Sequence, residues 1–236
     1  MLVKNPKPFY TGLALAASFV VVLILIFSPI FGGKNGLEYS DDIFNKLSKG
    51  SSYFIPGLAK KYEELQGKSL AVSFDLIKQD LVEKTTKVLN VAGLKVETQG
   101  TRLTIKGDLG IMAAKVLEDS DAVFKNEGRK VAQRYGLNER EVLAAWWDIL
   151  NNMSKTFQKE KKVQELDVVN EVNRRAVEPA YNFYQVESQR VKDRMGTLIG
   201  LLVFYVLYTM WWGYAIFLLF DGVGLSMKKA KVKKEV

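Results

Sequence analysis

Charged residues are missing from two long stretches of the chain. Residues 8–33 and residues 195–220 are each 26 positions without Asp, Glu, Lys or Arg, and large apolar side chains dominate both. A helix of about 20 apolar residues crosses the roughly 30 Å hydrocarbon layer of a bilayer. Buried helices of soluble proteins rarely extend this far without a charge. The pattern therefore predicts two transmembrane helices, at residues 9–32 and 196–220.

The first apolar window has a second interpretation, a cleaved signal peptide. Its apolar stretch is longer than the usual core of a signal peptide, and no clean small-residue cleavage site follows it. We therefore expect an uncleaved signal-anchor that remains as the first membrane helix.

The basic residues that flank the two windows predict an orientation. Lys4 and Lys7 precede the first window, and a Lys-rich tail follows the second. Cytoplasmic flanks of membrane helices carry an excess of Lys and Arg. We therefore expect an inner-membrane protein with both ends, residues 1–8 and 221–236, in the cytoplasm and residues 33–195 on the periplasmic, extracytoplasmic side. The tail lysines are Lys228, Lys229, Lys231, Lys233 and Lys234.

The net charge of +8 is spread unevenly between the long loop and the two ends of the chain. The long loop holds 27 basic and 24 acidic residues, so most of the excess lies in the two short ends. The charge therefore indicates topology, and we expect no nucleic-acid partner. The tail lysines either contact anionic lipid headgroups, at about 1 kcal/mol each, or serve only to fix the orientation.

A small β element is predicted between residues 69 and 107. Apolar and polar side chains alternate in three segments, which is the period of a half-buried strand: Ser69–Asp75, Leu94–Thr98 and Thr101–Lys106. Gln99-Gly100 is a candidate two-residue turn between the last two. Apolar positions from Ile77 to Ala92 fit one face of a helix. The order strand, helix, strand, strand leaves a split β-α-β unit as one possibility.

Helical spacing dominates from residue 108 to 195. Gly136 is expected to close a short helix, and Asn138 with Glu141 matches a capping box. Pro179 is expected to kink or end a later helix. We also hypothesise one continuous helix over residues 180–220, which would couple the loop to the second membrane helix. The fold class is thus a membrane protein of the α+β class. Two transmembrane helices flank a mostly helical extracytoplasmic domain with a three-stranded β element.

The missing residue types limit the chemistry. The chain has no His and no Cys, which excludes disulfides, thiolate nucleophiles, Cys/His zinc sites and imidazole catalysis. We expect no metal, no cofactor and no catalytic residue. The acidic run Glu118–Asp121 lacks the Gly and the closing Glu of a calcium loop, so we expect a solvated helix face. Trp146 and Trp147 are expected to pack in the core, with a ligand platform as the alternative.

Two features of the windows are candidate contact sites. Gly12 with Ala16, and Gly196 with Gly200, match the small-residue spacing of helix packing, either between the two helices of this chain or with another subunit. The second window is rich in aromatic residues, and we expect its polar aromatic side chains to contact a partner helix or lipid. These are Tyr205, Tyr208, Trp211 and Trp212.

By elimination, the expected function is that of a non-catalytic accessory or scaffold subunit of a larger inner-membrane complex. Its partners would be the lipid bilayer and other membrane subunits or further copies of itself. The alternative is an extracytoplasmic sensor that signals through a partner, because the cytoplasmic tail is too short for an output domain. A pore made of several copies and a carboxylate-only enzyme are weaker alternatives. No Asp, Glu, Lys or Arg lies within either window, which argues against an ion pathway.

Overall fold

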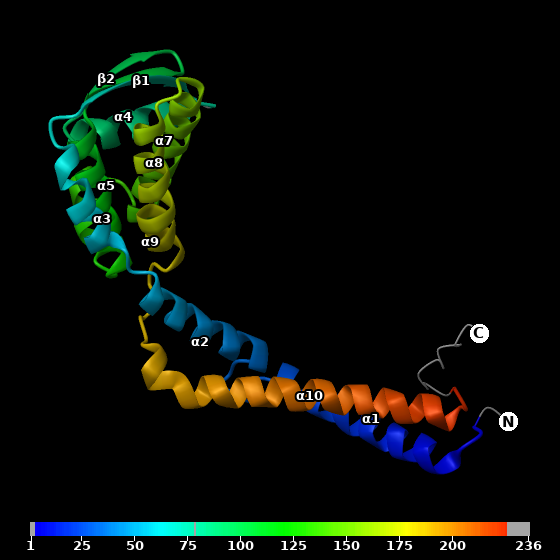
Figure 1. Cartoon of the computed structure of the whole chain (residues 1–236). Coiled ribbons are helices and arrows are strands. Elements are labelled where there is room, and N and C mark those ends of the chain that lie inside the picture. The colour runs from blue at the N-terminus through cyan, green and yellow to red at the C-terminus, as the bar shows by residue number, and fades with distance from the viewer. Residues whose placement is uncertain (1–2, 78, 226–236) are drawn as a thin grey trace, which may run out of the picture. The chain divides into compact units, whose positions relative to one another are not determined.

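The computed structural model describes residues 3–77 and 79–225, and it divides the chain into two compact units. The first, called the hairpin unit here, takes in the residues up to Phe44 together with those from Arg190 onward. The second, called the central unit, is Asn45–Gln189. The protein is mostly helical with one small antiparallel sheet (Figure 1). This confirms the α+β part of the expected fold class.

The hairpin unit is built on two apolar helices, α1 (Pro6–Phe27) and α10 (Met195–Gly222). Both are long and apolar enough to cross a membrane. They run antiparallel, since the backbone N–H groups of Lys4 and Asn5 both donate to the carbonyl of Gly222 at 2.9 Å. These bonds satisfy a carbonyl that the end of a helix otherwise leaves without a partner. Helix α2 (Gly36–Ser51) begins in this unit and ends in the central unit.

The hypothesis of one helix over residues 180–220 is wrong. Helix α9 (Glu178–Asn182) stops, a non-helical segment follows, and α10 begins only after the 3₁₀ turn η3 (Val191–Arg194). Gln185 has a positive φ of 66°, and its N–H donates to Asn126 Oδ1 at 2.8 Å.

Contacts made by Lys49 and Asn126 explain why the helix does not continue after α9. The Lys49 ammonium group donates to the carbonyls of Phe183 and Val186, at 3.1 and 2.7 Å, and to Asn126 Oδ1 at 3.0 Å. These partners, distant in sequence, take the polar backbone groups that a continuing helix would pair internally. Lys49 is only 3% exposed, and its burial lowers the pKa of its amine.

The sheet lies at one end of the central unit (Figure 1). Its strands are β1 (Ser69–Asp75), β2 (Lys95–Gln99) and β3 (Arg102–Asp108), in the order β1–β3–β2 with both pairings antiparallel. Helix α4 (Gln79–Val91) connects β1 to β2, so the topology is the split β-α-β unit. The hairpin turn is Gly100-Thr101 and not Gln99-Gly100, because Gln99 pairs with Arg102 and Gly100 takes the left-handed φ of 61°.

The remaining helices of the central unit pack with the sheet around a single apolar core. They are α3 (Ile55–Tyr62) with the 3₁₀ turn η1 (Glu63–Leu65), α5 (Leu109–Phe124), α6 (Gly128–Tyr135), α7 (Glu139–Lys159) and α8 (Val163–Val172). Helix α7 crosses the core, contacts β1 and α4, and buries Trp146, Met153 and Phe157.

Two local predictions in these helices are confirmed. Gly136 caps α6 in the left-handed conformation with φ 58°, and Asn138 with Glu141 forms the capping box of α7. Pro179 does not end its helix. The π-helical turn η2 (Asn173–Val177) precedes it, and α9 continues to Asn182. The wider π turn gives a proline ring room that a regular α turn lacks.

Candidate functional site

Small residues bring the helices of the hairpin unit into close contact. A Cβ on Gly12 would lie 2.9 Å from the Ala215 carbonyl oxygen, and a Cβ on Gly222 would lie 2.6 Å from the Cα of Phe9. Both distances are too short for a real side-chain carbon, so each position requires glycine. Of the residues singled out from the sequence, Gly12 lies in this contact, and Ala16, one turn further along, is half-buried.

The aromatic residues of α10 contact α1 through both their rings and their polar atoms. The Tyr208 hydroxyl donates to the Phe19 carbonyl at 3.3 Å, and Trp211 Nε1 donates to the Leu15 carbonyl at 3.1 Å. The Phe19 ring stacks on Tyr208 at 4.1 Å between centroids and meets Trp212 at 4.6 Å. The polar atoms of Tyr208 and Trp211 thus have partners in the same chain.

Other predicted contact residues of α10 lie at open positions. A Cβ on Gly196 or Gly200 would meet no atom within 4 Å, and Tyr205 is 64% exposed. The role of these residues in packing therefore stays a prediction. The five tail lysines, Lys228, Lys229, Lys231, Lys233 and Lys234, lie outside the described residues.

An apolar groove of about 910 Å³ lies within the hairpin unit. Its walls come from α1, the connection to α2, the start of α2 and the first half of α10, and nearly all of its lining is apolar. Tyr205 and Tyr208 both contribute to it. Their hydroxyl groups are among the few polar groups along a surface otherwise made by side chains such as Leu198 and Phe204.

The acidic run on α5 is not a solvated face, because Asp119 is fully buried. Arg134 and Tyr135 donate to its carboxylate, and Trp146 Nε1 donates to it at 3.0 Å. Burial raises the pKa of Asp119, while these donors act in the opposite direction. The sequence could not reveal this network, since its members are separated by up to 27 positions. The carboxylate is thus enclosed in the core and bonded to three donors.

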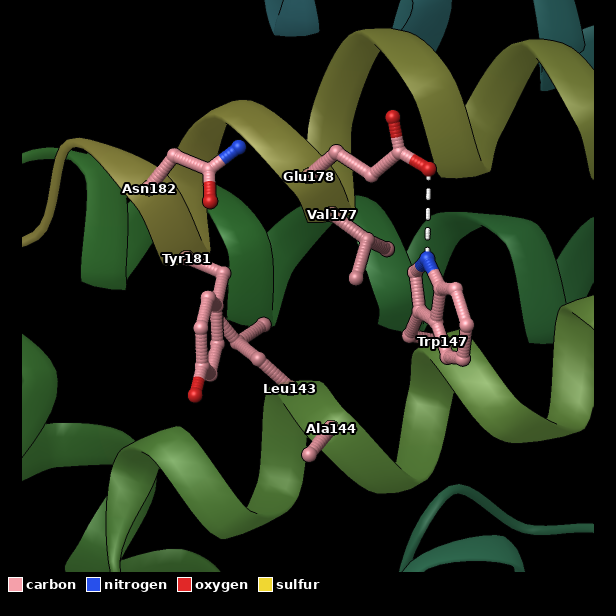
Figure 2. Close-up of a pocket in the computed structure, with 7 residues that line it drawn as sticks. All are labelled: Leu143, Ala144, Trp147, Val177, Glu178, Tyr181 and Asn182. Atoms are coloured by element: carbon pink, nitrogen blue, oxygen red, sulfur yellow. Dashed lines mark hydrogen bonds between the residues drawn. The ribbon is translucent and has the colours of Figure 1, made fainter.

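A shallow pocket of about 380 Å³ lies between α7 and the segment Val177–Asn182 (Figure 2). Trp147 and Tyr181 stand at its two ends, with the buried side chains of Leu143 and Val177 between them. Trp147 is 43% exposed, so the expectation of core packing holds for Trp146 and is wrong for Trp147. Helix geometry explains the difference, because adjacent positions on α7 point about 100° apart.

One carboxylate stands at the rim of this pocket. Trp147 Nε1 donates to Glu178 Oε1 at 3.1 Å. Figure 2 shows that the other oxygen of Glu178 points away from Trp147. Asn182 lies on the same rim. The pocket therefore combines two partly exposed aromatic rings, an apolar floor and one carboxylate at its rim.

Within residues 3–77 and 79–225, no group of three or more acidic side chains is placed to hold a metal ion. Comparison with protein-family models, with curated proteins and with solved structures finds no match for this chain. The site must therefore be interpreted from its own chemistry.

Proposed function

We propose that this protein is a membrane-anchored accessory subunit that docks other membrane proteins through its second helix and its central unit. The observation that carries the proposal is the hairpin of α1 and α10, two apolar helices that bind each other closely and still expose large apolar side chains. Examples are Ile24 and Leu25 on α1 and Leu202, Leu207 and Met210 on α10. In water such a surface would be costly, at about 25 cal/mol per Å² of apolar area, whereas in a bilayer it is favourable.

The ends of the hairpin support one topology. The chain enters α1 beside the last residue of α10, so both ends lie on the same side of any membrane that the hairpin crosses. With Lys4 and Lys7 at one end and the Lys-rich tail at the other, the cytoplasm is the favoured side. We propose that the central unit is periplasmic and that the helices lie in the inner membrane. An acyl chain of the bilayer would then fill the groove beside Tyr205.

The docking surface on α10 is the face that carries Gly196 and Gly200. Val203 and Leu207 continue this face at helical spacing, and both are exposed. Small residues let two helix backbones approach closely in a membrane, and α1 does not use these two. A helix of another subunit is the proposed occupant, and a helix from a second copy is the alternative outcome.

Photo-crosslinking in native membranes tests this proposal. A photoreactive amino acid at Val203 or Leu207 is expected to crosslink to a defined protein band, and one at Leu202 or Thr209, on other exposed faces of α10, is not. Gly200→Leu is expected to abolish the crosslink, whereas Gly213→Leu, at a glycine that is equally open, leaves it intact. Absence of any protein crosslink from Val203 and Leu207 would contradict a docking role for this face.

One observation favours a second candidate function, that of a sensor. The pocket beside Trp147 includes Tyr181 and Asn182, which directly precede the segment held by Lys49 and leading to α10. A ligand in the pocket would act next to that segment. A change in amide hydrogen exchange of residues 183–190 on ligand binding would support this role, and unchanged exchange would count against it.

A further inference from the structure

The pocket between Trp147 and Tyr181 has a composition that selects its ligand. Both aromatic side chains are more than 40% exposed, although each is large enough to bury much more of its surface. Between them lie Leu143 and Val177, which are buried, and Ala144. The floor therefore offers apolar contact, and the walls offer aromatic rings to whatever enters (Figure 2).

The carboxylate of Glu178 places a negative charge at the rim of this mostly apolar pocket. Its Oε1 accepts the hydrogen bond from Trp147, which fixes the carboxylate at the rim and uses the only indole donor of the pocket. The remaining oxygen is free to accept from a ligand. No cationic side chain is part of the pocket lining, so the described pocket does not itself neutralise this carboxylate.

We propose that this pocket binds an alkylated cation, an ammonium or guanidinium group carried on an apolar stem. Aromatic rings attract cations through their negative faces, and a carboxylate at the rim adds a direct charge contact. The guanidinium carbon of Arg140 lies 5.8 Å from the centroid of the Tyr181 ring and would repel a second cation there. We therefore place the charge of the ligand at Trp147 and Glu178, with Tyr181 in apolar contact. The stem of the ligand covers Leu143 and Val177.

Two other ligand classes fit less well. A proline-rich segment also uses aromatic grooves, but the Trp147 N–H that would bind its carbonyl is already engaged by Glu178. A sugar needs several converging polar groups, whereas Glu178 and Asn182 are the only polar non-aromatic side chains in the lining. The cation has two sources, a free quaternary amine or a Lys or Arg side chain of a partner protein. This inference does not depend on the proposed accessory role.

Ligand-observed NMR on the full-length protein in a non-ionic detergent tests the proposal. The probes are choline and its neutral isostere 3,3-dimethylbutanol, together with N-acetyl-lysine and N-acetyl-arginine methylamides. We expect at least one cationic probe to bind tenfold or more tightly than the neutral isostere. Glu178→Gln should weaken that binding about fivefold, and Trp147→Leu or Tyr181→Leu should remove it.

Control variants keep the result interpretable. Glu127→Gln changes an exposed carboxylate outside the pocket lining and should leave binding unchanged. Because Trp147 and Tyr181 are each more than 40% exposed, their truncation should lower the thermal unfolding temperature only slightly and leave the protein folded. Choline binding identifies a free quaternary amine as the source, and binding of the amino-acid probes alone identifies a partner side chain. Equal binding of cationic and neutral probes, no binding by any cation, or binding that survives both Glu178→Gln and Trp147→Leu overturns the proposal.

Discussion

The two units of this protein use similar side chains in opposite ways. In the central unit, large apolar residues such as Leu103, Ile149 and Phe157 are buried, and even the carboxylate of Asp119 is enclosed with its donors. In the hairpin unit, Ile24 and Leu207 are as apolar but more than half exposed. Burying apolar surface stabilises a unit in water, whereas the exposed apolar surface of α1 and α10 would be favourable in a bilayer, as we propose. The difference therefore supports the proposal that the hairpin unit lies in a membrane.

The largest expected effect lies in the central unit, at Asp119. Asp119→Ala leaves Arg134, Tyr135 and Trp146 without their shared acceptor, and removing one partner of a buried ionic network typically costs about 3–5 kcal/mol. Denaturant unfolding followed by circular dichroism in detergent measures the loss. Glu127→Gln, which changes an exposed ion pair with Lys130, should cost less than about 0.5 kcal/mol. A loss below about 1 kcal/mol for Asp119→Ala would show that the network does not stabilise this unit.

A smaller effect is expected where the central unit ends. Lys49→Met removes the donor that holds the carbonyls of Phe183 and Val186, and hydrogen bonds from a charged group contribute about 1.5–3 kcal/mol. We expect faster amide hydrogen exchange at Gln185 and its neighbours, with the sheet unaffected. Lys130→Met, at an exposed lysine, is the matched control. Unchanged exchange around Gln185 would mean that Lys49 does not hold this segment.

In the hairpin unit, we expect the contact between α1 and α10 to be disrupted by a larger side chain at Gly12. Gly12→Ala places a methyl group against the Ala215 carbonyl, and overpacking of this kind costs about 1–3 kcal/mol. The distance between spin labels at Leu13 and Met210, introduced as cysteines in a chain that has none, should increase in nanodiscs. Gly213→Ala, at an open position of α10, should leave the distance unchanged. An equal response to both substitutions would contradict the assigned contact.

The smallest effect is expected at Glu171, on the surface of the central unit. Hydrogen bonds from Lys61 and Tyr62 lower the pKa of this carboxyl group. A lowered pKa contributes stability above the unfolded value of 4.5, and this stability is lost as the pH falls through the folded value. Glu171→Gln should therefore cost about 1 kcal/mol at pH 7, and this cost should shrink as the pH is lowered below 4.5. A cost that is independent of pH would exclude a role for this charge.

Much of the fold could be predicted because its signals are local. Alternation located β1, β2 and β3, and a short pattern located the cap at Asn138. The turn at Gly100 was misplaced by one residue, since a glycine suits either central position of a two-residue turn. The end of α9 could not be predicted, because Lys49 and Asn126, which hold the following segment, are far away in sequence.

Some residues of the candidate sites could also be predicted from local sequence patterns, and others could not. Gly12 is four positions from Ala16, a small-residue spacing that predicts helix packing. Gly222 has no Gly or Ala at this spacing, although it makes an equally close contact. Asp119 stood in an acidic run that is typical of a solvated surface, and only the fold brings Trp146 to it. The sequence predicts core packing for both Trp146 and Trp147. The apolar face of this helix is wide, so its pattern does not show which of two adjacent residues faces the core.

Cysteine accessibility tests the proposal that α1 and α10 cross the membrane and that the central unit lies on the opposite side from both termini. Single cysteines at Val3, Gln133 and Ser226 are exposed to a membrane-impermeant maleimide in spheroplasts. Only Gln133→Cys should be labelled before lysis, and all three should be labelled afterwards. Labelling of the two terminal positions but not Gln133→Cys, or of all three in intact spheroplasts, would contradict it.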